Sequence, residues 1–221
     1  MIRTYTALLL VCLYAEAWGQ QPSQIGASFP RFTMAEGQED KDGLPTSGAK
    51  LCALGRPDVC YLMPSHADPG SGKVIYEFGL DPRSERLPLR GGGSWVFFSA
   101  TFSGGGSGTL ERVAVLRFDQ RDQRIINLMP YVAVTNAGHR AMWTIPGVSE
   151  FPILVLADFI WGEGETHYSD HFYQVEAWCF DPKLDQYKKV LSYKTDRKYN
   201  SETARVLVDE RQEIRRRLGA K

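Results

Sequence analysis

One stretch of the chain gathers several side chains that can bind a metal ion. It runs from residue 161 to residue 171 and reads WGEGETHYSDH. Imidazole and carboxylate groups together suit Zn²⁺ and other transition metals, which makes His167, Asp170 and His171 candidate metal ligands. Two glycines near its start favour a loop, in which the spacing of the histidines carries little information. An ordinary solvated loop is the alternative, because no HExxH motif is present, and we predict no cofactor.

Three carboxylates in and before the same stretch could act as a general acid and base. These are Glu163, Glu165 and Asp158, the last of which lies near the end of an otherwise apolar run. Two carboxyl groups held about 5–10 Å apart can hydrolyse a glycosidic bond. A carboxylate buried in a strand must be paired or have a raised pKa. Pairing with an arginine or a backbone group is the structural alternative for Asp158.

A third candidate site lies on one face of the strand expected at residues 172–180. Alternate residues of a strand share a face, so Gln174, Glu176 and Trp178 should lie side by side. A tryptophan next to amide and carboxylate groups can stack on a sugar or a peptide and hydrogen-bond to it. The alternative is that this face packs beneath the C-terminal helix or against another sheet.

The elements that would position these residues are mainly strands. Residues 94–103 alternate between two faces, whereas Val113–Phe118 and Phe151–Trp161 are apolar on both faces, as expected for central strands of a sheet. Polar segments that begin with aspartate, as at Asp119–Gln123 and Asp181–Asp185, are typical of turns between paired strands.

The pattern as a whole predicts a mostly β fold. We expect an antiparallel meander that forms a sandwich or an open barrel, with a small β-propeller-like array as the alternative. Asp81–Arg86 is expected to be a turn after a strand that ends at Leu80. The glycine-rich segment Ser103–Thr109 is expected to be a hairpin tip, since no Gly-Lys-Ser/Thr follows it and no helical pattern begins there.

The C-terminal part of the chain predicts one α-helix. Ser201–Leu218 contains no turn residues, and its apolar positions form a narrow helical stripe. Asn200 or Ser201 could cap its start, and arginines in its last turn complement the helix dipole. We therefore expect an antiparallel β domain at residues 51–199 and a C-terminal helix at residues 200–221 that packs on it.

The N-terminal part has the pattern of a signal peptide over residues 1–19. A positive charge at Arg3 precedes a short apolar run, small residues follow, and cleavage is expected after Gly19. Residues 20–50 are polar and rich in turn formers, which predicts a flexible leader. These features predict a soluble exported protein, secreted or periplasmic, without stable membrane insertion.

The cysteine spacing agrees with export. Cys52 and Cys60 are separated by turn formers and are predicted to form a disulfide, a bond typical of oxidising compartments. Such a short loop would contribute about 2–3 kcal/mol to stability. Cys179 is predicted to be an unpaired thiol that packs as a small apolar side chain.

The composition limits the classes of partner. The 26 basic and 26 acidic residues balance, so we predict no nucleic-acid partner. With no complete catalytic motif, the sequence favours a non-enzymatic binding or interaction protein, with a glycan or an envelope protein as partner. The first alternative is an extracytoplasmic hydrolase, metal-dependent or not, that uses the Asp158–His171 region. The second is a structural component of the cell envelope, and the oligomeric state is open.

Overall fold

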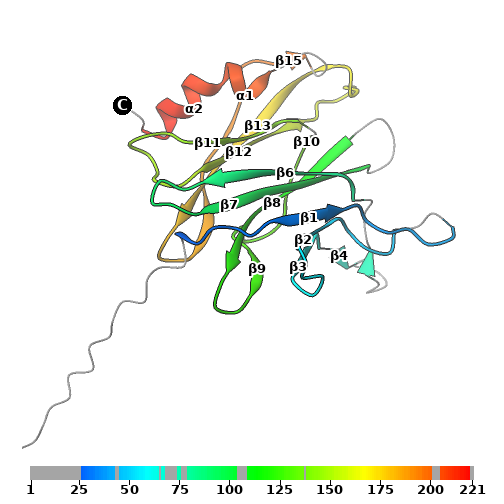
Figure 1. The fold of residues 1–221 in the computed structure, drawn as a ribbon. Coiled ribbons are helices and arrows are strands. Elements are labelled where there is room, and N and C mark those ends of the chain that lie inside the picture. The colour runs from blue at the N-terminus through cyan, green and yellow to red at the C-terminus, as the bar shows by residue number, and fades with distance from the viewer. Residues whose placement is uncertain are drawn as a thin grey trace, which may run out of the picture.

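The computed structural model describes residues 26–42, 45–64, 66–67, 74–75, 79–103, 109–136, 138–200 and 205–219. Within these residues the protein is mostly antiparallel β-structure, with two short helices near the C-terminus (Figure 1). The sheets are open and stacked in layers, which confirms the predicted sandwich-like β fold. The predicted signal peptide and the tip of the glycine-rich segment, residues 104–108, lie outside the described residues.

The first five-stranded sheet is built around β8. Its strands are β6 (Leu80–Pro88), β7 (Ser94–Ser103), β8 (Thr109–Asp119), β9 (Arg124–Asn127) and β10 (Ala133–Asn136). The order is β10-β8-β7-β6, and β9 pairs with the last residues of β8. The apolar run of β8 is buried on both faces, as expected for a central strand.

The second five-stranded sheet is built around β12 and β13. Its strands are β11 (Arg140–Trp143), β12 (Ile153–Ile160), β13 (Asp170–Asp181), β14 (Gln186–Lys194) and β15 (Tyr199–Asn200). The order is β11-β12-β13-β14, and β15 pairs with the start of β13. The central strand predicted within residues 151–161 is confirmed, because β12 pairs with a strand on each side.

The two five-stranded sheets face each other across an aromatic and aliphatic core. Trp95 and Phe97 of β7 pack with Leu154 of β12 and with Trp178 and Phe180 of β13. The ring centroids of Trp95 and Phe180 are 4.8 Å apart. Each buried leucine or phenylalanine side chain contributes about 1.5–3 kcal/mol relative to exposure, so this core holds the two sheets together.

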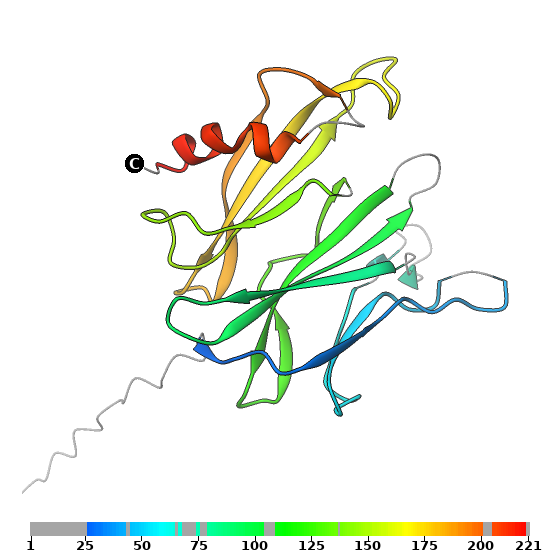
Figure 2. The same ribbon diagram turned by 45° about the horizontal axis from the view of Figure 1, so that its top comes forward.

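Two further layers cover the outer faces of the sandwich (Figures 1 and 2). The outer elements are α1 (Val206–Asp209), α2 (Arg211–Arg217), β1 (Phe32–Ala35), β2 (Lys50–Ala53), β3 (Cys60–Leu62) and the two-stranded pair β4 (His66–Ala67) and β5 (Val74–Ile75). The helices lie over the second sheet, with Val206 and Ile214 buried against it. The β1-β2-β3 sheet covers the first sheet, with Leu51 buried between them.

The segment predicted to be a flexible leader, residues 20–50, contributes to the fold from residue 26 onward. Phe29 is 3% exposed and packs in the core beneath the first sheet. Its backbone N–H donates to Ser94 O at 3.1 Å. Arg86 donates to the carbonyl oxygens of Phe29 and Pro30 at 2.6 and 3.0 Å. One buried ring and a few hydrogen bonds thus anchor a segment whose composition is polar.

In place of the single helix predicted over residues 201–218, the described part of this segment contains two short helices that meet at Glu210. Residues 201–204, which include the predicted cap Ser201, lie outside the described residues. Glu210 has a turn-like backbone, with φ −79° and ψ −3°. Its carboxylate accepts hydrogen bonds from the hydroxyl groups of Tyr193, at 2.7 Å, and Tyr199. Asn200 belongs to β15, and α1 begins after Arg205 without a side-chain cap. Tertiary contacts therefore override the helical pattern at this point.

The turn predicted at Asp81–Arg86 is wrong, since these residues belong to the edge strand β6. Asp81 has φ +46°, and the register of β6 against β7 shifts between Leu80 and Arg83, which is a β-bulge. An edge strand has a partner on one side only, so it tolerates the missing N–H of Pro82. The Asp-Pro pair marks a bulge here instead of a turn.

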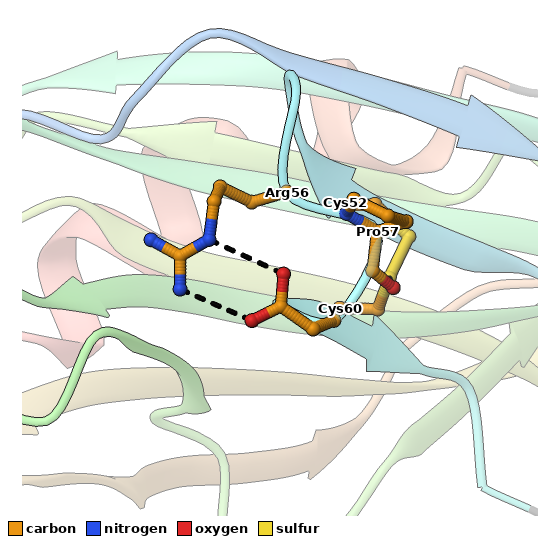
Figure 3. The surroundings of a disulfide bond; sticks show 5 residues. Cys52, Arg56, Pro57 and Cys60 are labelled. Carbon is orange, nitrogen blue, oxygen red and sulfur yellow. Dashed lines mark hydrogen bonds and ion pairs between the residues drawn. A yellow bond between two sulfur atoms is a disulfide. The ribbon is translucent and has the colours of Figure 1, made fainter.

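The predicted disulfide between Cys52 and Cys60 is confirmed (Figure 3). The two cysteines are opposite each other in the β2–β3 pair, with 4.0 Å between their Cα atoms. In the turn between them, Arg56 and Asp58 form an ion pair with nitrogen–oxygen distances of 3.1 and 3.2 Å. Cys179 of β13 is an unpaired, half-buried thiol, and burial raises its pKa.

Candidate functional site

The candidate residues fall on opposite faces of the second sheet. In β12, Asp158 shares a face with Leu154 and Leu156, which pack in the core between the two sheets. Phe159 faces the other way, and His171 stacks on its ring with 4.4 Å between the centroids. Because successive residues of a strand alternate between faces, the sheet separates Asp158 from His171. The sheet therefore keeps Asp158 apart from His171, whereas Glu165 and His171 are 3.0 Å apart on the other side.

Asp158 is held by two hydrogen bonds to the same carboxylate oxygen. Asn136 Nδ2 donates to Oδ1 at 2.5 Å, and the backbone N–H of Phe159 donates to it at 2.9 Å. Burial raises the pKa of Asp158, and the nearby carboxylate of Glu176 raises it further. Among the described residues, Asp158 is thus paired with amide donors and with no arginine.

The face predicted to bind a sugar or a peptide is directed toward the first sheet. Trp178 is 2% exposed and packs between the two sheets, with the ring of Tyr131 edge-on at 5.4 Å. Gln174 donates to a hydroxyl group of β14 at 2.8 Å, and Lys189 Nζ donates to Glu176 Oε1 at 2.8 Å. The burial of Trp178 is therefore explained by packing against the first sheet. Gln174 and Glu176, on the same face, are only partly exposed.

The loop that joins β12 to β13 is organised by the carboxylate of Glu165. Its Oε2 atom accepts a hydrogen bond from the backbone N–H of Gly162 at 2.6 Å and lies 3.0 Å from His171 Nδ1. Its Oε1 atom accepts from Lys198 Nζ at 2.6 Å. Lys198, followed by the Gly162 N–H, lowers the pKa of Glu165 to about 2. The ionised carboxylate therefore ties both ends of the loop to the connection between β14 and β15.

A tight turn inside the loop adds a second set of hydrogen bonds. Ser169 Oγ accepts from the backbone N–H of Thr166 at 2.9 Å, and Thr166 O accepts from the N–H of Ser169 at 2.9 Å. His171 Nε2 lies 2.9 Å from the same carbonyl oxygen. Asn200 Nδ2 donates to Asp170 Oδ1 at 3.1 Å, where β15 pairs with β13. The loop backbone is thus held at its ends and in its middle.

This loop presents two exposed aromatic side chains. Trp161 is 52% exposed and Tyr168 is 68% exposed. The indole of Trp161 is supported edge-on by His167, with 4.8 Å between the ring centroids, and contacts His171 at 5.0 Å. Exposed tryptophan and tyrosine side chains on ordered backbone are enriched at the centres of binding surfaces. We call residues 161–170 the aromatic loop; in Figure 2 it is the yellow connection between β12 and β13.

The candidate metal ligands lie in this loop or next to it. His171 has both ring nitrogens within hydrogen-bonding distance of protein oxygens, Asp170 accepts from Asn200, and His167 packs against Trp161. In the ranges that the structure describes, no three His, Cys, Asp or Glu side chains gather so that they could hold a metal ion. A zinc-binding role for these residues stays a prediction.

Sequence reasoning singles out the acids and histidines of the loop and misses three other residues. Two aromatic residues in an otherwise polar connection, Trp161 and Tyr168, are a signal that could have drawn attention to them. Lys198 follows Glu165 by 33 positions, and no local pattern links the two. Glu163, the remaining candidate acid, is exposed in the loop.

Comparison with known proteins returns no match for this chain: no family model, no curated protein and no solved structure is significantly similar to it. None of the helices in the described ranges is long and apolar enough to span a membrane. Function is therefore inferred from the geometry of the aromatic loop.

Proposed function

We propose that the protein is a non-enzymatic binding protein that acts outside the cytoplasm and contacts its partner through the aromatic loop. The observation that carries this proposal is the exposure of Trp161 and Tyr168 on a loop that Glu165 holds in place. A loop that is already ordered loses little conformational entropy on binding. Exposed tryptophan and tyrosine rings supply much of the binding energy of a small contact surface.

Two features support the proposed location. The N-terminal pattern predicts a signal peptide, and the Cys52–Cys60 disulfide is of a kind that persists in oxidising compartments. Mass spectrometry of the protein recovered from the extracytoplasmic fraction of its source cell should find an N-terminus at Gln20. A chain that retains residues 1–19 in the cytoplasmic fraction would contradict the proposed location.

A photo-reactive residue in the loop tests the contact surface without knowledge of the partner. p-Benzoylphenylalanine, which inserts into C–H bonds of sugars and proteins alike, replaces Tyr168 in the protein produced in its source cell. Tyr131, which is 54% exposed between β9 and β10, is the matched control position. We expect an adduct from position 168, less of it when Trp161→Ala is added, and none from position 131. No adduct from position 168, or equal adducts from both positions, would contradict the proposal.

The fold should survive the loss of the exposed ring. Trp161 contributes edge-on ring contacts, so Trp161→Ala should cost no more than about 1 kcal/mol of the free energy of unfolding. Trp95, which is fully buried between the sheets, provides the contrast, since Trp95→Ala should cost about 3–5 kcal/mol. Urea unfolding of both variants therefore separates a lost contact surface from a lost fold.

A further inference from the structure

We infer that the partner of the aromatic loop is a neutral glycan, recognised by stacking on Trp161 and Tyr168, and not a protein surface. This inference rests on the proposed function, because it names the partner of the same loop. Three features of the loop support this inference: its exposed apolar side chains, its short polar side chains and the sign of its exposed charges.

The loop exposes few large apolar side chains compared with the number of residues in a stable protein interface. Such an interface engages about 20–30 residues and about 800 Å² on each partner. Trp161 and Tyr168 are the large apolar side chains that the loop exposes. The other exposed large apolar side chains of the described ranges lie outside the loop and outside β12, β13 and β15: Met34, Leu54, Leu62, Leu80, Tyr131, Val134, Leu184, Val190 and Val208. A sugar unit, by contrast, needs no more than one ring to stack on.

Short polar side chains lie in the same loop as the two aromatic residues or on the strand beside it. They are the side chains of Glu163, Thr166, Ser169 and Asp170 in the loop and of Asn200 beside it. Carboxylate oxygens can accept hydrogen bonds from the hydroxyl groups of a sugar, and hydroxyl and amide groups can both donate to these groups and accept from them. An aromatic face next to a few polar groups is the usual composition of a site that both stacks on a ligand and orients it.

The exposed charges of the loop are acidic. Glu163 and Asp170 are exposed, whereas the ammonium group of Lys198 is engaged with Glu165 at 2.6 Å. Like charges repel, so an acidic polysaccharide is disfavoured at this surface. A neutral glycan meets no such repulsion, and its binding should depend little on salt because no ion pair is formed.

A glycan array of neutral and acidic polysaccharides tests the inference with the purified protein. The variants are Trp161→Ala, Tyr168→Ala and, as the matched control, Tyr131→Ala, each checked for an unchanged thermal midpoint. We expect neutral glycans to bind the wild-type protein, with about tenfold weaker binding for each loop variant. Tyr131→Ala should bind like the wild type. Binding should change little between about 0.05 and 0.5 M salt.

The outcomes separate this inference from the proposed function. Binding restricted to acidic glycans, or reduced by Tyr131→Ala as much as by the loop variants, would overturn the inference. If no glycan binds while position 168 cross-links to a protein, the glycan inference is wrong and the proposed function stands. If no glycan binds and position 168 forms no adduct, both are wrong.

Discussion

Arg117 of β8 and Asp185 of the β13–β14 turn form an ion pair that links the first five-stranded sheet to the second. Arg117 is buried, and its Nη2 atom donates to Asp185 Oδ2 at 2.6 Å. Among the described residues, its Nε atom has no hydrogen-bond partner. A buried guanidinium depends on a charged partner, so this pair fastens the tip of the β13–β14 hairpin to the first sheet.

Asp185→Asn should reduce the free energy of unfolding by about 2–3 kcal/mol, since Arg117 loses the charge that compensates its burial. Asparagine tolerates the left-handed backbone of residue 185, where φ is +52°, so the turn itself remains. Urea unfolding measures the change. The double variant Arg117→Met/Asp185→Asn should recover part of the loss, because no unpaired charge stays buried. A loss below about 0.5 kcal/mol in the single variant would show that the pair does not stabilise the sandwich.

Removal of the charge at Glu165 should loosen the aromatic loop. Glu165→Gln loses its ion pair with Lys198, so its thermal midpoint near neutral pH should lie below that of the wild type. Lys198 and Gly162 lower the pKa of Glu165 from 4.5 to about 2. The stabilisation is therefore fully present above pH 4.5 and is lost as the pH falls toward 2. Over this window the wild-type midpoint should fall more steeply than that of Glu165→Gln.

The matched control for that experiment is Glu163→Gln. Glu163 has the same charge and lies two positions away, but it is exposed. The thermal midpoint of Glu163→Gln should equal that of the wild type at every pH. If Glu163→Gln and Glu165→Gln behave alike, the two acids act only through the overall charge of the loop.

Loss of the disulfide should lower stability by a predictable amount. For a loop as short as that between Cys52 and Cys60, Cys52→Ala/Cys60→Ala should reduce the free energy of unfolding by about 2–3 kcal/mol. Urea unfolding of the wild type in reductant should give the same value. Cys179→Ser, which leaves the disulfide intact, should respond to reductant as the wild type does. An effect of reductant on the Cys52→Ala/Cys60→Ala protein would point to a second redox-sensitive bond.

The two tyrosine hydroxyl groups on Glu210 should make the docking of the helices sensitive to alkali. Burial, with the hydrogen bond to Glu210, raises the pKa of Tyr193 and of Tyr199 above the ordinary value of 10. A tyrosine whose pKa is higher in the folded state than in the unfolded state stabilises the fold only while its hydroxyl group is protonated. The contribution of these two tyrosines is therefore present below pH 10 and is lost as the pH rises above 10. Tyr193→Phe and Tyr199→Phe should each cost about 1 kcal/mol near neutral pH.

Urea unfolding at several alkaline pH values checks this expectation. The stability of the Tyr193→Phe/Tyr199→Phe protein should fall less steeply above pH 10 than that of the wild type. Tyr168→Phe, which removes an exposed hydroxyl group, is the control and should leave the alkaline curve unchanged. An identical alkaline curve for the double variant would exclude the Glu210 contacts as its cause.

The parts of the fold that could be predicted are those with a local signal. β8 and β12 are apolar on both faces, so their central positions follow from the sequence alone. The Cys52–Cys60 pair follows from its short spacing. The burial of Trp178 depends on the packing of β13 against β7, whose residues lie far earlier in the chain. No periodicity reveals which sheet will cover a given face, so the ligand-binding interpretation of that face could not be tested in advance.

The arrangement of the candidate site also depends on contacts between strands that the sequence does not reveal. Asp158 and Phe159 face opposite ways because strands alternate, but the consequence for His171 depends on the register between β12 and β13. Glu165 is a candidate from the sequence because it is an acid in a polar loop. Its ion pair with Lys198 could not be predicted, because Lys198 lies in the β14–β15 connection, far from it in the sequence. Glu165 holds its loop in place through a tertiary contact that the local sequence does not reveal.

The disulfide has a consequence for how the protein is made. Its cysteines are near neighbours along the chain and share one small outer sheet, whereas Cys179 lies in a different sheet. A chain is synthesised from its N-terminus, so Cys52 and Cys60 leave the ribosome long before Cys179 does. During biosynthesis the native bond can therefore close before Cys179 is synthesised. When the reduced chain from residue 20 onward refolds in vitro, the thiols of Cys52, Cys60 and Cys179 are all present at once, so wrong pairings should slow its oxidation.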